Sequence, residues 1–444
     1  MVVIFETIGF NLYMLRESKE QDEILIYNNI SKTYNTYSKK RAINFLYYEL
    51  EKKDICIISL LKEEDIEVDP KNQEKFKAFK IKVLNRIFDD EVKLVDNLGY
   101  KPIDSLTFTH NEKNYFNLYK KSKLLREFES NNNEFPRIKA LIFNLVGNIE
   151  GHYNYFNKWL AWQLQNPLNR LPTSIILQGE HGTGKTKFCE LVLKNIFENN
   201  FTEIGQTEIN ADYNDFIVGK QLIVANEVIH NDNKFLVPDK LKNFVTDEYL
   251  SIKQRFKDTY YIQNYSQWIF VSNNQVPLKI EAGDRRYTIF KSKKLIDGFT
   301  LINGLIQNLD NELKGYLNYL LNLEVKFIEV SQPLDNKEKQ DLIEASWNSV
   351  DDFFYHSKEV GGFDVLNKTY MEEDDIYKNY FELHNLSVGV CIISQNLYTL
   401  YKKFCDDAGY KPFGRANFIR ELRRFGFSPS VQRIEEKTQR VVVL

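Results

Sequence analysis

The sequence contains few cysteines and no long apolar run, and each of these shortages excludes a class of protein. Its four cysteines are scattered and form no C-x-x-C pair, which excludes a cysteine zinc site and a disulfide framework and fits a reducing cytoplasm. No stretch approaches the roughly eighteen apolar residues of a membrane-spanning helix. Glu6 interrupts the apolar N-terminus before a signal core develops. We therefore expect a cytoplasmic protein without membrane contact.

A strong net charge is also missing. The 59 Lys and Arg against 62 Asp and Glu leave a formal charge of −3, so any contact with nucleic acid must come from local patches. A hydrophobic content of 43% and a charged content of 27% are globular values, which exclude wholesale disorder. At 444 residues the chain is long enough for roughly two to four domains.

One phosphate-binding motif is complete. The segment from Gly179 to Thr186 matches G-x-x-x-x-G-K-[ST] at every fixed position. The apolar run 174–178 before it predicts a buried strand, and the apolar spacing of residues 188–196 after it predicts a helix. Glycines allow backbone N–H groups to surround an anion at the helix N-terminus. The residues that we expect to bind ATP are Gly179, Glu180, His181, Gly182, Thr183, Gly184, Lys185, Thr186 and Lys187.

Two of these loop residues have distinct expected roles. Lys185 would contact the β- and γ-phosphates, and the Thr186 hydroxyl would ligate Mg²⁺. The alternative, an ordinary glycine turn, is disfavoured because a strand and a helix flank the loop in the required order.

A second apolar strand, over residues 221–227, ends in Asn226 and Glu227 and resembles a Walker B strand. A phosphate loop requires such an acidic site, which holds Mg²⁺ and polarises water. We expect Glu227 to be the general base and to contribute to the metal site. Asn226 stands where an aspartate is usual, which weakens direct metal ligation there. The alternative for Glu227 is a surface acid that follows a core strand.

A third strand, over residues 268–273, ends at Asn273, whose amide is placed to sense a γ-phosphate. The alternative for Asn273 is a turn former. Arg285 and Arg286 precede the next apolar strand, and one of them, with Arg286 favoured, would be an arginine finger for a neighbouring subunit. The alternative is a surface salt bridge between Asp284 and Arg285.

The segment 250–261 between these strands is basic and aromatic. In an extended chain Lys253, Arg255 and Lys257 would share one face, and a turn at residues 257–259 would close a hairpin. Cations in a row beside tyrosines suit a single-stranded backbone. The alternative is a solvated edge strand protected by its lysines.

The chain divides into three predicted regions. Residues 1–134 form an accessory α+β region, with a strand at 24–27, a helix around 42–46 and a turn-prone linker at 129–134. Residues 135–330 alternate helices and strands, which predicts a parallel α/β core. Its first helical pattern places Ile138, Ile142, Leu145 and Ile149 on one face. Residues 345–444 form a mostly helical module that ends in β-structure. Six cations there favour phosphate contact, with packing or partner binding as the alternative: Lys411, Arg415, Arg420, Arg423, Arg424 and Arg433.

In their order along residues 135–300, these motifs resemble superfamily 3 helicases, AAA+ ring motors of viruses, phages and mobile elements, and most of all the primase-helicase type. Residues 397–422 resemble the winged-helix module that commonly ends such proteins. The resemblance implies an AAA+ P-loop NTPase core, a C-terminal winged-helix-like domain, a hexameric ring, and 3′-to-5′ travel on DNA. It places Lys242, Lys253, Arg255 and Lys257 in a DNA-binding central channel. It also implies a primase-polymerase domain upstream, so the chain is either a portion of a longer protein or a self-standing helicase.

We therefore expect an ATP- and Mg²⁺-dependent DNA helicase for phage or mobile-element replication in the host cytoplasm. Single-stranded DNA is the expected partner, and duplex DNA is a second one through the C-terminal module. Two alternatives stay open: an RNA-acting viral ATPase, and an origin-binding or assembly protein with little turnover.

Overall fold

A computed structural model of the chain describes residues 9–15, 23–52, 73–130, 133–227, 236–255, 258–274, 280, 283–345, 347–359, 384–386, 389–434 and 437–443. These residues fall into two compact units. The first comprises Met1–Pro277 with Arg285–Leu334, and the second comprises Leu278–Asp284 with Asp335–Leu444. In the described ranges no helix is both long enough and apolar enough to cross a membrane.

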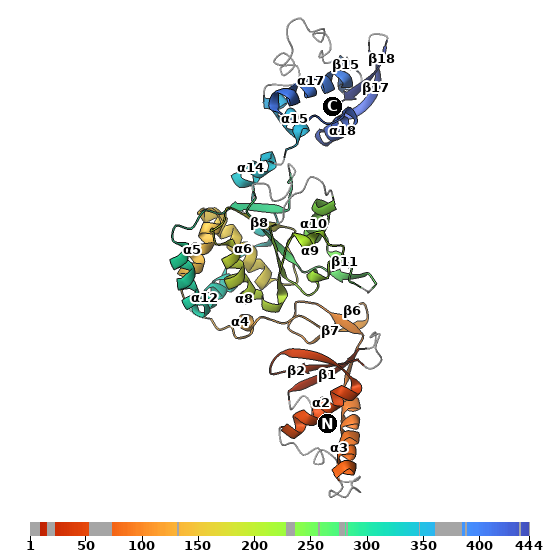
Figure 1. Cartoon of the computed structure of the whole chain (residues 1–444), viewed down its shortest axis with the longest axis vertical. Helices are drawn as coiled ribbons and strands as arrows, with labels where there is room; N and C mark the ends of the chain where they lie inside the picture. The colour runs from red at the N-terminus through yellow and green to blue at the C-terminus, as the bar shows by residue number, and fades with distance from the viewer. Residues whose placement is uncertain are drawn as a thin grey trace. The chain divides into compact units, whose positions relative to one another are not determined.

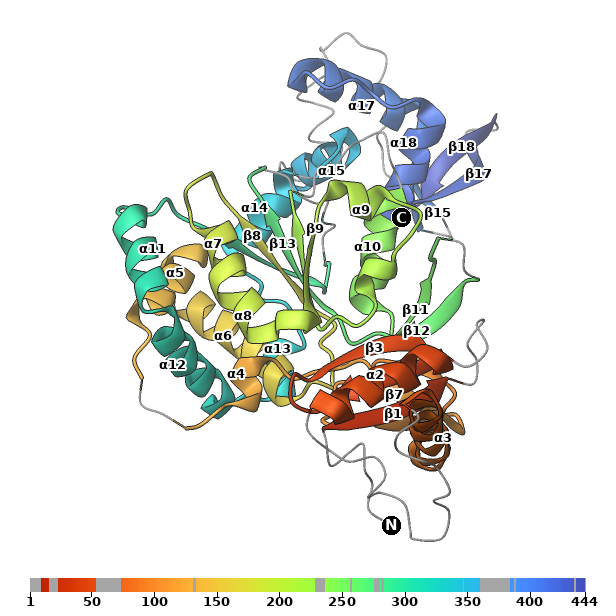
Figure 2. The same cartoon turned by 60° about the horizontal axis from the view of Figure 1, so that its bottom comes forward.

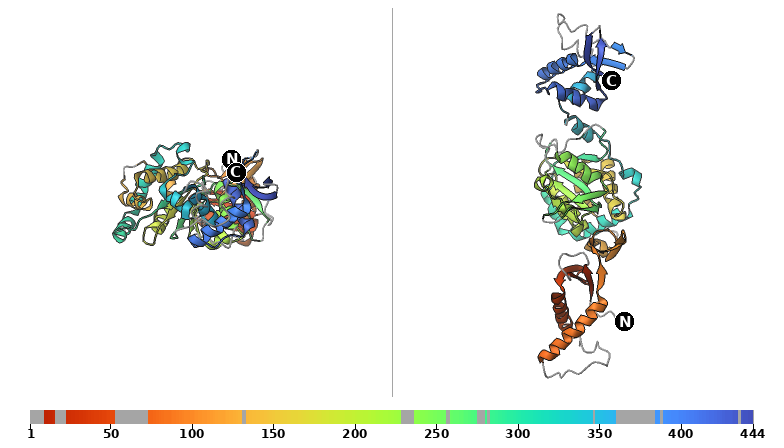
Figure 3. Two further views of the ribbon diagram at one scale, coloured as in Figure 1. Left: turned by 90° about the horizontal axis from the view of Figure 1, so that it is seen from above. Right: turned by 90° about the vertical axis from the view of Figure 1, so that its right-hand side faces the viewer.

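The first unit begins with a four-stranded sheet of order β3-β2-β1-β4. Two helices cover one face of it through a cluster that includes Ile24, Leu46 and Phe88; α3 is the long orange helix in the right-hand view of Figure 3. The strand and the helix that the sequence predicts at 24–27 and 42–46 are β2 and α2. The bounds are β1 Phe10–Leu15, β2 Glu23–Asn28, β3 Thr33–Ser38, β4 Lys93–Val95, α2 Lys39–Lys52 and α3 Gln73–Glu91.

The opposite face of that sheet packs on Phe116, which belongs to a second, three-stranded sheet of order β5-β7-β6. The Asn117 side chain donates to the carbonyls of Lys101, Ile103 and Ser105, so it fixes the loop between β5 and β6. The bounds are β5 Asn97–Gly99, β6 Thr107–His110, β7 Lys113–Asn117 and α4 Lys123–Arg126.

The core of the first unit is a five-stranded parallel sheet of order β14-β8-β13-β10-β9. Strands β8, β10, β13 and β14 are almost continuously buried, which is the pattern of a parallel sheet covered on both faces. The strands that the sequence predicts at 174–178, 221–227 and 268–273 are β8, β10 and β13. The bounds are β8 Ser174–Gln178, β9 Phe201–Ile204, β10 Leu222–Asn226, β13 Gln267–Ser272 and β14 Tyr287–Lys291.

Helices lie on both faces of this sheet (Figure 2). Alternate strand residues such as Ile175 and Leu177 join the cluster formed with most helices, whereas Trp268 stacks on Phe244 of α10. One cluster contains residues of α5 Pro136–Leu145, α6 Glu150–Gln165, α7 Lys185–Phe188, the π-turn η2 Cys189–Leu193, α8 Lys194–Phe197, α11 Gly298–Gln307, α12 Leu309–Asn322 and α13 Phe327–Val330. The remaining elements of the core are η3 Glu198–Asn200, α9 Gln206–Asn210, η4 Asp215–Ile217 and α10 Leu236–Thr246.

One helical prediction in this core is wrong in its extent. The apolar spacing from Ile138 to Ile149 predicts a single buried face, but α5 ends at Leu145 and Ile149 is exposed. Gly147 and Asn148 both have positive φ angles, which turn the chain between α5 and α6.

The second unit, drawn in blue in Figure 1, is built on an antiparallel sheet of order β15-β16-β18-β17. Its helices bury an aromatic cluster in which Phe353, Tyr401 and Phe418 are in contact. The bounds are α14 Lys337–Ala345, α15 Ser349–Glu359, β15 His384–Leu386, β16 Gly389–Ile393, α17 Ser394–Ala408, α18 Arg415–Leu422, η6 Arg423–Phe425, β17 Ser428–Ile434 and β18 Lys437–Val443.

Candidate nucleotide site

The phosphate loop joins the end of β8 directly to the start of α7. Gly182 and Gly184 have φ angles of +79° and +90°, which glycine adopts without strain. A Cβ on Gly184 would stand 2.5 Å from the Leu141 side chain, so this position also requires close packing against α5. The local backbone is therefore the tight glycine turn at a helix N-terminus that phosphate binding requires.

The Lys185 ammonium lies inside this turn. Its Nζ donates to the carbonyls of Gly179 (2.6 Å) and Glu180 (2.9 Å) and to the Thr183 hydroxyl (2.9 Å). The side chain is almost fully buried, and this burial lowers the pKa of Lys185 to about 8. Its present partners are neutral oxygens, so a phosphate in the loop would give the cation its first anionic neighbour.

The other loop residues differ in exposure. Thr183 is buried, whereas His181 and Thr186 are exposed. Lys187 is also exposed, and its Nζ pairs with Glu190 at 2.7 Å on the same helical turn. Thr186 and Lys187 thus lie at the solvent side of the loop.

The strand order brings the phosphate loop, Asn273 and Glu227 together at the edge of the sheet formed by the carboxyl ends of the strands. β13 lies between β8 and β10, and parallel strands end at the same edge (Figure 2). The Gly179 N–H donates to Ser272 O at 3.1 Å, and the Glu227 N–H donates to Val271 O at 2.8 Å. Asn273, which follows β13, has its Nδ2 3.4 Å from Nδ1 of His181. The phosphate loop, Asn273 and Glu227 therefore adjoin one another.

Glu227 has an unusual backbone. Its φ angle is +54°, a left-handed conformation that costs a non-glycine residue about 1 kcal/mol or more. The residue is exposed at the end of β10. The preceding Asn226 donates from Nδ2 to Oε2 of Glu203 on β9 at 3.0 Å, so it directs a second carboxylate toward this edge.

Arg285 and Arg286 lie at the opposite edge of the sheet. They precede β14, and the Ser174 N–H at the start of β8 donates to Arg286 O at 2.7 Å. The five residues of β14 correspond to about 16 Å along the sheet. Arg285 is exposed, and the Arg286 guanidinium lies 6.0 Å from the Tyr287 ring centroid. Neither arginine is near the phosphate loop of its own molecule.

The predicted hairpin exists, but its cations are not where the sequence places them. β11, Tyr249–Ile252, pairs antiparallel with β12, Tyr260–Gln263. The predicted strand with Lys253 and Arg255 aligned on one face is wrong, because β11 ends at Ile252 and both residues lie in the connecting loop, exposed. Lys257 lies outside the described residues. Lys242 is half-buried on α10.

A buried asparagine fixes the base of this hairpin. Asn214 accepts from the Lys253 N–H (2.7 Å), donates from its side chain to Ser251 O (2.9 Å), and donates from its backbone to Lys253 O (3.2 Å). The start of the basic loop is thereby held to the segment that precedes β10.

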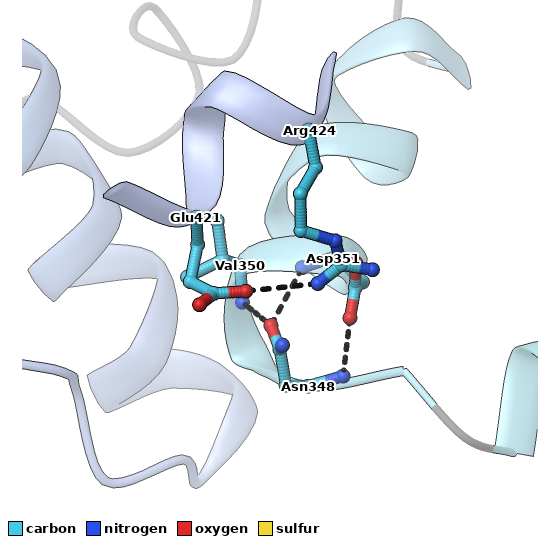
Figure 4. Close-up of polar contacts among 5 residues, drawn as sticks. All are labelled: Asn348, Val350, Asp351, Glu421 and Arg424. Atoms are coloured by element: carbon cyan, nitrogen blue, oxygen red, sulfur yellow. Dashed lines mark hydrogen bonds and ion pairs between the residues drawn. The ribbon is translucent and has the colours of Figure 1, made fainter. Parts of the chain in front are cut away.

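Two of the six C-terminal cations are engaged inside the second unit. Arg424 pairs with Asp351 (3.0 Å) and Glu421 (2.9 Å), as Figure 4 shows. Arg415 donates to Gln395 and Ser394. For these two residues the packing alternative holds. Four cations stay exposed: Lys411, Arg420, Arg423 and Arg433.

The described residues contain no cluster of three or more His, Cys, Asp or Glu side chains able to hold a metal ion. Mg²⁺ in a phosphate-binding site does not require one, since it keeps waters and takes one or two protein ligands plus phosphate oxygens. The exposed Thr186 hydroxyl beside the glycine turn fits that donor set.

Residues 177–286 match a family of unknown function (DUF5906). A DNA primase-polymerase of Nitratiruptor phage NrS-1 is 28% identical over 239 residues, which cover 52% of this chain and 32% of that protein. The chain therefore spans about one third of the length of this relative.

Solved structures of the NrS-1 C-terminal region match almost the whole chain. One apo structure aligns with a TM-score of 0.70 and 18% identity, covering 99% of this chain and 97% of that one. The chain has the fold of the NrS-1 C-terminal region. A second, the A form apo structure, gives a TM-score of 0.68 over 100% and 99% of the two chains. The sequence is thus related to a phage DNA primase-polymerase, and the fold matches a part of that protein.

Proposed function

We propose that the chain is a Mg²⁺-dependent ATPase that couples hydrolysis to movement along single-stranded DNA in phage DNA replication. The observation that carries this proposal is the gathering of the phosphate loop, Asn273 and Glu227 at one edge of the sheet. A loop that binds phosphate, an acid that activates water and an amide that contacts the γ-phosphate are the minimal parts of an ATPase site.

Each residue has a separate task in this proposal. Lys185 would neutralise charge on the β- and γ-phosphates, and Thr186 and Glu227 would hold Mg²⁺, which would supply further positive charge for the phosphates. Glu227 also orients the attacking water, and Asn273 senses the γ-phosphate.

Arg286, or Arg285, completes the pocket of an adjacent subunit. Their position at the edge opposite their own phosphate loop supports a role between subunits. In a closed ring every subunit has a neighbour that can supply this arginine, and the family that the motifs resemble forms hexameric rings.

The DNA strand would contact Lys242, Lys253, Arg255 and Lys257. The exposure of Lys253 and Arg255 in the hairpin loop supports this part. The second unit orders its elements as helix α15, strand β16, helices α17 and α18, and strands β17 and β18, which fits a winged-helix-like module. Arg420 and Arg423 at the end of α18 would contact duplex phosphates.

Strand displacement on forked DNA with ATP tests the proposal. We expect unwinding and DNA-stimulated ATP turnover, and we expect Lys185→Ala to reduce turnover by a factor of about 10² or more, since transition-state charge loses its main cation. A folded Lys185→Ala protein with full turnover would refute the site.

One observation favours a second candidate, a nucleotide-dependent assembly protein with little turnover. Asn226 replaces the usual aspartate and is bonded to Glu203. Ring formation on ATP binding with negligible hydrolysis would support it. The same assay with single-stranded RNA separates a DNA motor from an RNA-acting ATPase.

A further inference from the structure

The first unit contains a second cationic site, far in sequence from the phosphate loop. A cavity of about 170 Å³ opens between the turn that joins β2 to β3 and the chain from Ile103 to Arg126. We call it the basic pocket. Its lining includes Lys32, Lys120, Lys121, Arg126, Asp104 and Tyr27.

The charges of the basic pocket are unbalanced. Asp104 is its one carboxylate, and it pairs with Lys121 at 2.9 Å. In the described part of the chain, Lys32, Lys120 and Arg126 have no carboxylate within ion-pair distance. The Lys120 Nζ lies 4.8 Å from the Tyr34 ring centroid, and an Arg126 guanidinium nitrogen donates to Lys121 O at 2.7 Å.

This arrangement disfavours the charged form of Lys120. Its half-burial and the neighbouring Arg126 charge both lower the pKa of Lys120, in that order. An anion bound beside these two cations would stabilise the charged form of Lys120. The nearby Tyr27 hydroxyl stays protonated, because its burial raises the pKa of Tyr27, and it can donate to the same anion.

The turn that carries Lys32 is both ordered and strained. The Asn28 side chain accepts from the N–H groups of Ile30 and Ser31. Lys32 itself has a φ of +55°, where glycine or asparagine is the usual residue. The turn thus holds a lysine, at a cost of about 1 kcal/mol, where its chain lines the pocket.

We propose that the basic pocket binds a phosphate group, carried either by single-stranded DNA or by a free nucleotide. Lys32, Lys120 and Arg126 supply the charge, and Tyr27 supplies a neutral donor. Pockets that enclose whole small molecules measure about 300–1,000 Å³. The basic pocket is smaller, so it accommodates the phosphate and leaves the base outside. This site is independent of Lys185.

Protection of Lys120 from acetylation tests the proposal on the full-length chain carrying Lys185→Ala, which removes the phosphate-loop contribution. Labelling is followed site by site by mass spectrometry with inorganic phosphate, thymidine monophosphate or a (dT)12 strand. We expect at least fivefold slower labelling of Lys120. Lys123 is the internal control, since it is exposed three residues away and lies 4.0 Å from Glu127.

The three probes distinguish the sources of the phosphate. Protection by (dT)12 alone, at micromolar concentration, identifies a DNA strand, and protection by thymidine monophosphate as well, with or without protection by inorganic phosphate, identifies a free nucleotide. Unchanged Lys120 labelling with every probe overturns the proposal. Failure of the ATPase assignment leaves this result unaffected, because the phosphate loop is already disabled.

A double variant tests whether a probe bound at another site of the chain could account for the protection of Lys120. Lys32→Ala with Arg126→Ala removes two charges of the pocket, and we expect it to raise the probe concentration that half-protects Lys120 about tenfold while the unfolding midpoint stays constant. Lys123→Ala is the matched loss of one nearby charge and should leave protection intact. Equal protection in the double variant and the parent would refute the basic pocket as the binding site.

Discussion

Lys185 combines deep burial with neutral hydrogen-bond partners, and this combination would make the proposed nucleotide binding sensitive to pH. Its pKa is lowered to about 8, so its positive charge is lost as the pH rises through 8. A bound phosphate stabilises the cation and raises that pKa, hence binding weakens above pH 8.

We therefore predict that the Kd for ATP rises about tenfold between pH 7.5 and pH 9, measured by equilibrium titration. The ATP phosphates are already ionised in this range, since their second pKa is near 6. Lys185→Arg is the control, because an arginine keeps its charge and its profile should be flat, although binding is weaker throughout. A profile in the parent protein that is equally flat would contradict the role of Lys185.

Arg424 and Arg423 are adjacent in η6 but have opposite environments. Arg424 neutralises Asp351, which is 3% exposed, and the same carboxylate accepts from the Asn348 N–H (Figure 4). Asn348 in turn accepts from the N–H groups of Val350 and Asp351, so the network forms the N-terminus of α15.

We predict that Arg424→Ala lowers the free energy of unfolding of the second unit by about 2 kcal/mol, because Asp351 is left buried without a cation. The neighbouring Arg423→Ala should leave stability unchanged and weaken duplex DNA binding instead. Denaturant unfolding and DNA titration of both variants check this pair. A stability loss in Arg423→Ala equal to that in Arg424→Ala would contradict the distinction.

At the scale of elements, the hairpin formed by β11 and β12 presents Lys253 and Arg255, both exposed, in its loop. We predict that alanine at both positions preserves basal ATP turnover and reduces DNA stimulation at least tenfold, because phosphate contacts are lost. Turnover is measured with and without single-stranded DNA. The matched control is Lys220→Ala with Lys194→Ala, and unwinding that survives the hairpin variant would refute the strand contact.

The elements that the sequence predicts well are those in which burial alone decides the conformation. β8, β10 and β13 are short apolar runs with polar residues at their ends, and a parallel sheet buries such runs completely. The phosphate loop followed from fixed residue types. The phosphate loop lies beside Asn273 and Glu227 only because β13 stands between β8 and β10, and no local sequence pattern specifies this strand order.

The conformation of the basic loop, the end of α5 and the basic pocket could not be predicted from the sequence. Cations alternate along residues 253–257, and such alternation occurs in loops as well as in strands. The two-residue period therefore predicted the wrong conformation. Ile149 fits the helical spacing, but Gly147 and Asn148 end the helix. The sequence does not predict the basic pocket, because Lys32 is far in sequence from Lys120 and Arg126 and approaches them only through the packing of two sheets.

At the scale of the whole molecule, the proposed role of Arg286 or Arg285 requires a neighbouring copy, because both arginines lie at the edge of the sheet opposite their own phosphate loop. We predict that Lys185→Ala and Arg286→Ala, each with little turnover alone, regain about one quarter of the parent turnover when mixed in equal amounts, since about one pocket in four then joins an intact Lys185 to an intact Arg286 of its neighbour. Turnover is measured for each variant alone and across mixing ratios. No recovery in any mixture would contradict a pocket shared between copies.

The hydrogen bonds between Asn214 and the hairpin connect the hairpin mechanically to β10. These three hydrogen bonds fasten Ser251 and Lys253 to the chain that continues through η4 into β10 and ends at Glu227. In the proposed function, a force that a DNA strand exerts on the hairpin loop would therefore be transmitted through Asn214 and β10 to Glu227, the proposed general base. Asn214→Ala would then leave the hairpin loop and the proposed nucleotide site intact but uncouple the movement of one from the other.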